Sequence, residues 1–165
     1  MGVNFLHEYD KNVRNKKIMT AEELWKNFLR NRHPEVSEYD SWAFGDDADL
    51  LAKLVLQGEK TATASAYVLY QLEGEPLPKV GEYSVVLDSQ DNAVCVIETK
   101  KVTILPFSSV TEEHAYKEGE GDKSLSYWRE VHERFFRQEL EEAGLEFTPE
   151  ILVVCEEFVL VYSEQ

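Results

Sequence analysis

Apolar residues recur at helical spacing in several segments of the chain. Thr20-Ala-Glu-Glu23 has the pattern of a capping box, and the apolar positions after it predict a helix over residues 21–31. A second apolar stripe ends at Gly58, where a left-handed helix terminus favours glycine, and an aspartate among residues 46–49 caps its start. We expect two further helices, a short one over 111–118 and a long one over 124–142.

Other segments have the β-branched and apolar character of strands. Turn-forming residues at 88–92 join two of these segments, 83–87 and 93–98, into a predicted hairpin. Its second strand extends towards residues 102–105. Residues 31–45 are expected to form a connection that leads into the second helix, and residues 67–79, with two prolines, an ordered excursion. The strands are expected over residues 61–66, 83–87, 93–98 and 151–162.

Length and composition favour one globular domain. We divide the 165 residues into an N-terminal tail, 1–19, and a single domain, 20–165, that includes an N-terminal helical extension. No apolar run approaches the roughly 20 residues of a membrane span. The start of the chain lacks the pattern of a secretory signal, so we expect a cytoplasmic location. Cys95 and Cys155 lie in apolar runs, which predicts reduced, buried thiols.

The chain is strongly acidic, with a net charge of −15. Residues 101–165 hold 15 of the acidic side chains against 6 basic ones. Because nucleic-acid affinity usually rests on Lys and Arg that neutralise phosphates, this balance argues against a duplex-DNA partner. It does not exclude a nucleoside or a short RNA bound in one local pocket.

Residues 58–63, Gly-Glu-Lys-Thr-Ala-Thr, place a lysine and two hydroxyls at a chain reversal. An amine and a hydroxyl held close together make an activated nucleophile, provided that the lysine is uncharged. Residues three apart face opposite sides of a regular strand, so Lys60 and Thr63 converge only if Lys60 lies in the turn before it. The alternative is a solvated lysine and a threonine packed in the sheet.

A second candidate is the acidic, glycine-rich segment Glu118-Gly-Glu-Gly-Asp122. It lacks EF-hand spacing, thiolates and paired histidines, so we predict neither a metal site nor a cofactor. We expect Glu118 to turn inward and orient Lys60 or a substrate. The expected substrate-binding residues, for which packing or surface positions are the alternative, are Trp42, Phe44, Ser65, Glu120, Asp122, Trp128 and His132.

Taken in order, these segments resemble the ASCH domain family, which is similar in fold to PUA domains. The resemblance covers residues 42–163. It is carried by residues 54–65, 77–81, 95–98, 106–107, 110–115, 118–122 and 128–136. It implies an α+β fold, a small, mostly antiparallel β-barrel with flanking helices. The acidic segment and the Trp-Arg-x-x-His-x-x-Phe-Phe sequence after it resemble a bacterial branch of the family.

The resemblance also implies an activity, because compact bacterial members are amidohydrolases of N4-acetylcytidine that use a Lys, a Thr and a Glu. These match Lys60, Thr63 and Glu118. By that likeness Thr63 attacks the acetyl carbonyl, Lys60 takes the hydroxyl proton, and Glu118 positions Lys60 or the nucleoside. The chain departs from the family pattern at Ser65, where compact members have Arg, so a different substrate remains open.

Two other functions remain open at this point. The first is an RNA-binding or RNA-processing module, and the second is a domain that binds a small molecule without turning it over. Related barrels host both binding and catalysis, so the fold alone does not decide between these functions. The sequence carries no signal for the oligomeric state.

Overall fold

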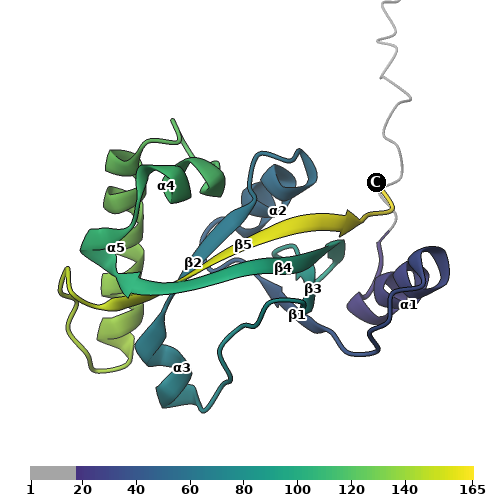
Figure 1. Cartoon of the computed structure of the whole chain (residues 1–165), viewed down its shortest axis with the longest axis horizontal. Coiled ribbons are helices and arrows are strands. Elements are labelled where there is room, and N and C mark those ends of the chain that lie inside the picture. The colour runs from purple at the N-terminus through teal and green to yellow at the C-terminus, as the bar shows by residue number, and fades with distance from the viewer. Residues whose placement is uncertain (1–17) are drawn as a thin grey trace, which may run out of the picture.

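The computed structural model describes residues 18–165, so most of the predicted tail lies outside the described residues. One five-stranded sheet and five α-helices make up this part of the chain (Figure 1). The helices are α1 (Ala21–Arg32), α2 (Ala48–Leu56), α3 (Tyr67–Glu73), α4 (Glu112–Glu118) and α5 (Leu125–Glu142), and the strands are β1 (Asp40–Ala43), β2 (Ala62–Ala66), β3 (Tyr83–Leu87), β4 (Ala93–Pro106) and β5 (Leu152–Tyr162).

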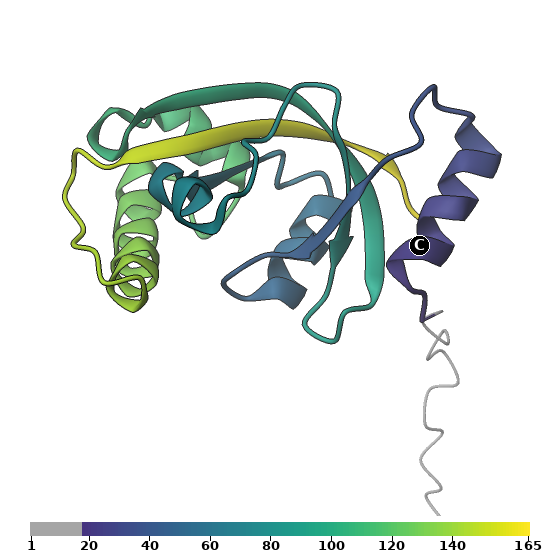
Figure 2. The same cartoon turned by 90° about the horizontal axis from the view of Figure 1, so that it is seen from below.

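The sheet has the strand order β1-β3-β4-β5-β2. The β1–β3 pair is parallel and the other three pairs are antiparallel. Within the described residues the edge strands β1 and β2 do not pair with each other, so the curled sheet is a half-barrel. Figure 2 shows the long strands β4 and β5 arching over α2 and α3. The predicted α+β class and flanking helices are confirmed.

Apolar side chains from the helices cover both faces of the sheet in three clusters. One cluster joins α2 to the sheet through Val55 and Phe158, and we call this side the inner face. A second joins α1 to β3 and β4, and it includes Met19, which is buried although it belongs to the predicted tail. The third packs Trp128 and Phe136 of α5 against β5. The site described below lies where α4 and α5 meet the start of β2.

Local signals placed the helix ends well. Thr20 and Glu23 form the predicted capping box of α1, and Asp47 caps α2. The helix that ends at Gly119 and the long helix after it are both present. No helix among the described residues has the length and apolar character needed to cross a membrane.

Two elements were not predicted. Strand β1 lies in the segment expected to be a connection, and its four mostly exposed residues show no alternating pattern. It forms by parallel pairing with β3, which no local pattern encodes. Helix α3 lies in the expected excursion and ends at Gly74, so Pro76 and Pro78 follow the helix and do not interrupt it.

Both cysteines are buried and unpaired, as predicted. Cys95 packs in the cluster on the inner face, and Cys155 packs against the residues of α5. Burial raises the pKa of each thiol to about 12. Both side chains therefore act as small apolar groups.

Candidate functional site

Lys60 lies in the turn between α2 and β2. Gly58 has φ +74°, and the backbone N–H groups of Glu59 and Lys60 both donate to the carbonyl of Leu54. Because β2 begins at Ala62, Lys60 precedes the regular strand, as the convergence of Lys60 and Thr63 required. Its side chain is buried, with 2% of the residue exposed, so the alternative of a solvated lysine is wrong.

The ammonium group of Lys60 lies among two carboxylates and an aromatic ring. Its Nζ is 3.2 Å from Glu118 Oε1 and 3.1 Å from Glu120 Oε2. The same atom lies 5.1 Å from the centre of the Phe44 ring, a distance that suits a cation–π contact. Burial of such a charge is tolerated only when it is paired, and these contacts supply the pairing. The expected inward turn of Glu118 towards Lys60 is therefore present.

Glu118, the last residue of α4, is the centre of this network and is 1% exposed. Its Oε2 is 2.9 Å from His114 Nε2, one helical turn earlier, and it accepts a hydrogen bond from the indole N–H of Trp128. Its Oε1 lies 3.4 Å from His132 Nε2. Oε1 therefore contacts Lys60 and His132, and Oε2 contacts His114 and Trp128. These contacts fix the orientation of the carboxylate.

The charges in this network favour one protonation state. Burial alone would raise the pKa of Glu118, but Lys60, His132 and His114 together hold it well below its usual value. Burial opposes the charged form of His132 as well, yet Glu118 and the Trp128 carbonyl raise its pKa. His132 Nδ1 lies 2.9 Å from that carbonyl, so both ring nitrogens face acceptors. The arrangement suits an ionised Glu118 beside a doubly protonated His132.

Backbone contacts hold the acidic segment against the Lys60 turn. The amide of Thr61 donates to the Lys117 carbonyl at 2.7 Å. Gly119 has φ +72°, and a Cβ atom at this position would lie 2.1 Å from the Glu59 carbonyl oxygen. Only glycine therefore permits this approach, which places Glu118 and Glu120 beside Lys60.

Several expected substrate-binding residues lie in or next to this network. The rings of Trp128 and His132 are stacked, with centroids 4.1 Å apart. Trp42 packs edge-on against Phe44 on the inner face. Both aromatic pairs are mostly buried, so packing accounts for their present contacts.

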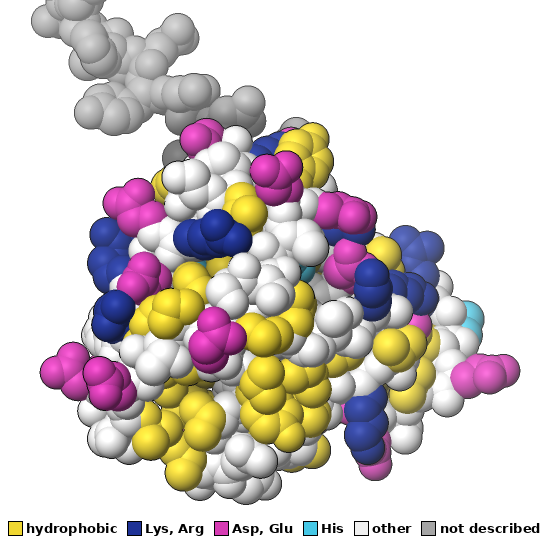
Figure 3. Space-filling view, turned by 60° about the vertical axis from the view of Figure 1, so that its left-hand side comes forward, with side chains coloured by type: hydrophobic (Ala, Val, Ile, Leu, Met, Phe, Trp, Pro, Cys, Tyr) yellow, Lys and Arg dark blue, Asp and Glu magenta, His cyan; other side chains and the backbone are white. Residues whose placement is uncertain are grey.

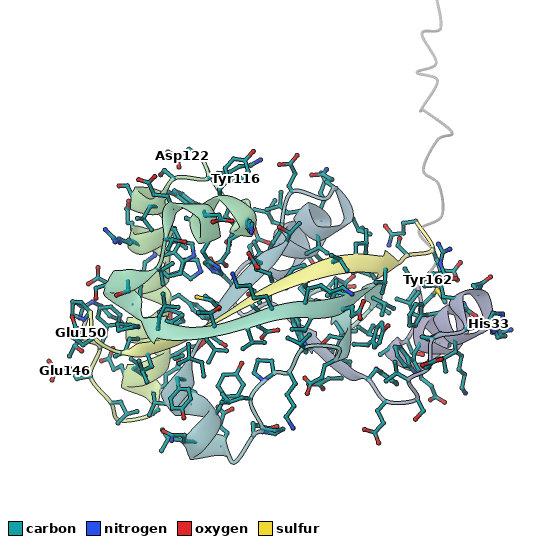
Figure 4. The ribbon with its side chains drawn as sticks, in the orientation of Figure 1. His33, Tyr116, Asp122, Glu146, Glu150 and Tyr162 are labelled. Atoms are coloured by element: carbon teal, nitrogen blue, oxygen red, sulfur yellow. The ribbon has the colours of Figure 1, made fainter. Side chains whose placement is uncertain are left out.

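Three expected residues have no hydrogen bond to this network among the described residues. Asp122 is exposed and accepts a hydrogen bond from the Ser124 amide, and Figure 4 shows it near Tyr116 at the outer edge of the α4–α5 region. Ser65 pairs with the hydroxyl of Tyr70 at 2.7 Å. Thr63 is half-buried on β2, and within residues 18–165 no hydrogen bond joins it to Lys60.

Two residues of interest were not among the candidates. His114 lies four residues before Glu118, a spacing that places both on one helix face. Glu156 interrupts an apolar strand and lies directly opposite Thr63. Burial, and in smaller part Glu82, raise the pKa of Glu156 to about 7 against the opposing hydrogen bond from Thr99. The interruption of β5 by two glutamates was the available signal.

Glu118, Glu120 and His132 also present ligand atoms within 4.8 Å of one another, a spacing that could hold a metal ion. The ammonium of Lys60 already contacts both carboxylates, however, and supplies the positive charge there. A metal ion would have to displace Lys60, so the donor set fits a lysine better than a metal.

Comparison with known proteins identifies the family. The sequence model of the ASCH domain family matches residues 40–162. The chain belongs to the ASCH domain family. The ASCH domain of Lactobacillus crispatus JV V101 is 35% identical, with a TM-score of 0.80 over 86% of this chain and 93% of that one. Protein EF3133 of Enterococcus faecalis V583 is 41% identical, with a TM-score of 0.78 over 85% and 86% of the two chains.

More distant comparisons concern the fold alone. The hypothetical protein PH0355 is 15% identical, with a TM-score of 0.52 over 75% of this chain and all of that one. The curled half-barrel is of the ASCH and PUA-like type that the sequence suggested, as the family match and the two ASCH-type structures at 35% and 41% identity show. Domains of this family bind small molecules or RNA. A search of curated proteins finds no match.

Proposed function

We propose that this ASCH domain is a nucleoside-directed amidohydrolase that removes an N-acyl group, such as the acetyl group of N4-acetylcytidine. The observation that carries the proposal is the buried Lys60–Glu118 pair. A structural ion pair of this kind is weak evidence for stability, because burying two charges costs about as much as their attraction returns. Strongly perturbed buried groups of this type are typical of functional sites.

In this proposal the hydroxyl of Thr63 attacks the acyl carbon, and Lys60 takes the hydroxyl proton. The C–N bond then breaks as Lys60 returns this proton to the leaving exocyclic nitrogen, which leaves an acyl ester on Thr63 that water hydrolyses to the carboxylate and the free hydroxyl. Glu118 orients Lys60. The present contacts of Lys60 are ion pairs, and a proton-accepting amine must be uncharged. Lys60 therefore has to lose a proton on substrate binding before the attack.

A mass-spectrometric assay of N4-acetylcytidine hydrolysis tests this function. We expect the unmodified protein to form cytidine and acetate, and Thr63→Val to lose at least about 100-fold in turnover because the nucleophile is gone. Thr103→Val is the matched control, since Thr103 lies opposite Cys155 on the other face of the sheet. We expect it to keep full turnover.

Because removal of Lys60 endangers the fold, the turnover of Lys60→Met is interpreted only if a thermal melting curve shows that the variant is folded. Full turnover by folded Thr63→Val or Lys60→Met would refute the assigned roles. Ligand-induced stabilisation without turnover would instead indicate a binding domain. Salt-sensitive affinity for RNA would indicate an RNA-binding module. The face in Figure 3 mixes Lys and Arg with acidic side chains and shows no continuous basic surface, so this face does not suit RNA.

A further inference from the structure

The inner face of the sheet carries a short polar row on β2 and β5. Strand register places Thr63 opposite Glu156 and Ser65 opposite Val154. Residues directly opposite each other in an antiparallel pair point to one face, with Cβ atoms about 4.5–5.5 Å apart. Phe158, two residues after Glu156, packs against α2, so this row faces α2 as well. Glu156 therefore lies beside the proposed nucleophile.

Within the part of the chain that the structure describes, Glu156 has no cationic partner. Among residues 18–165 its described side-chain contact is the hydroxyl of Thr99, which donates to Oε2 at 3.4 Å. The acidic Glu82, just before β3, and the phenol of Tyr70, on α3, are the other titratable groups that act on it. β2 contributes uncharged hydroxyls. This environment contrasts with the Lys60 network, and burial raises the pKa of Glu156 to about 7.

A carboxyl group near its pKa offers chemistry that a carboxylate does not. The protonated form has an O–H donor beside a carbonyl acceptor, whereas the ionised form only accepts. The protonated form therefore fits an edge that pairs an acceptor with a donor. A pyrimidine of the cytosine type has this edge, with the lone pair of ring N3 next to the exocyclic N4–H.

We propose that Glu156 recognises the ligand through paired hydrogen bonds to the N3 and N4–H edge of a cytosine-type base. This inference rests on the proposed function, because the acyl group of N4-acetylcytidine is attached to that same N4. Binding of the base edge at Glu156 would bring the acyl carbon towards Thr63, its neighbour across the β2–β5 pair. In this arrangement Glu156 on β5 recognises the base, and Thr63 on the neighbouring strand β2 attacks the acyl carbon.

Calorimetric titration of cytidine at pH 6 and pH 8 tests the inference without requiring turnover. Since only the protonated fraction of Glu156 binds, the affinity should fall about tenfold between these values for a pKa of about 7. Gln retains one donor and one acceptor, so Glu156→Gln should bind equally at both pH values. Glu157→Gln, on the opposite face, is the control and should follow the unmodified protein.

Two further ligands define the edge that is recognised. In 3-deazacytidine a C–H group replaces N3, so we expect weak binding that does not depend on pH. Adenosine presents a similar acceptor and donor pair at N1 and N6–H. Weaker binding of adenosine than of cytidine supports a pyrimidine, and tighter binding of adenosine overturns the cytosine assignment.

Several results would overturn the role of Glu156. These are undetectable cytidine binding at pH 6, a flat pH profile for the unmodified protein, and an unchanged pH slope in Glu156→Gln. Normal binding by Glu156→Gln with turnover reduced more than about 100-fold would make Glu156 a proton acceptor for Thr63 instead. Failure of the proposed function appears differently, as pH-dependent cytidine binding by a protein that hydrolyses no N4-acetylcytidine.

Discussion

Two glutamates near β2 are both largely buried, yet their environments shift their pKa values in opposite directions. Glu118 lies among Lys60, His114 and His132, and its pKa is held well below the usual range. Glu156 has no cation nearby among the described residues, and burial raises its pKa to about 7. The comparison shows that burial sets the cost of the charge and that the neighbours decide whether the charge remains. One half-barrel thus holds a fixed carboxylate and a titrating carboxyl group.

The largest expected effect comes from removing the fixed charge. Glu118→Gln leaves Lys60 buried without its main partner, and breaking a buried ion pair costs about 3–5 kcal/mol of unfolding free energy. Urea denaturation at pH 7 measures this. Glu113→Gln, on an exposed position of the same helix, should change stability by less than about 0.5 kcal/mol.

A double variant sharpens the result. Lys60→Met with Glu118→Gln removes both charges, so it should recover part of the loss seen in Glu118→Gln alone. A single variant as stable as the unmodified protein would mean that the ion pair is not the dominant partner of Glu118.

The second effect concerns the glycine that lets the acidic segment approach Lys60. Gly119→Ala should destabilise by at least about 2 kcal/mol, because a positive φ adds to a Cβ position 2.1 Å from the Glu59 carbonyl oxygen. Gly74 also has a positive φ but nothing within 4 Å, so Gly74→Ala isolates the backbone cost. Equal melting temperatures of the two variants would contradict the close approach.

The third effect separates the titrating carboxyl from the fixed one. A raised carboxyl pKa contributes stability below the unfolded value near 4.3, and this contribution is lost as pH rises towards the folded value of about 7. The glutamine of Glu156→Gln cannot ionise. The free energy of unfolding of this variant, relative to that of the unmodified protein, should therefore rise by roughly 2 kcal/mol between pH 5 and pH 8. Urea denaturation at both pH values, with Glu157→Gln as control, measures the gain.

The sequence predicted more of the charged site than of the polar row. The contact between Lys60 and Glu118 was predicted because glycines and turn geometry are local signals. The caps of α1 and α2 are local signals of the same kind. Strand β1 depends on its partner β3, and helix α3 was concealed by the prolines after it. The position of Glu156 opposite Thr63 depends on strand register between segments far apart in the chain, which no local pattern carries.

The smallest expected effect concerns His132, which reports on Glu118. A raised histidine pKa contributes stability below the unfolded value, and that stability is lost as pH rises through the folded value. The ring of His132 should therefore titrate above its ordinary pKa in an NMR experiment, and Glu118→Gln should lower that value, with exposed His33 as the reference signal.

His132→Asn should lose about 1 kcal/mol more at pH 6 than at a pH above the raised pKa of His132, because the contact with Glu118 at 3.4 Å is charged only below that pKa. The stacking on Trp128 is lost at both pH values, so the difference between them isolates the charge. A pH-independent loss would mean that His132 supports the site by packing alone. The network around Lys60 would then hold Glu118 through Lys60, His114 and Trp128, and the contrast with Glu156 would rest on those three.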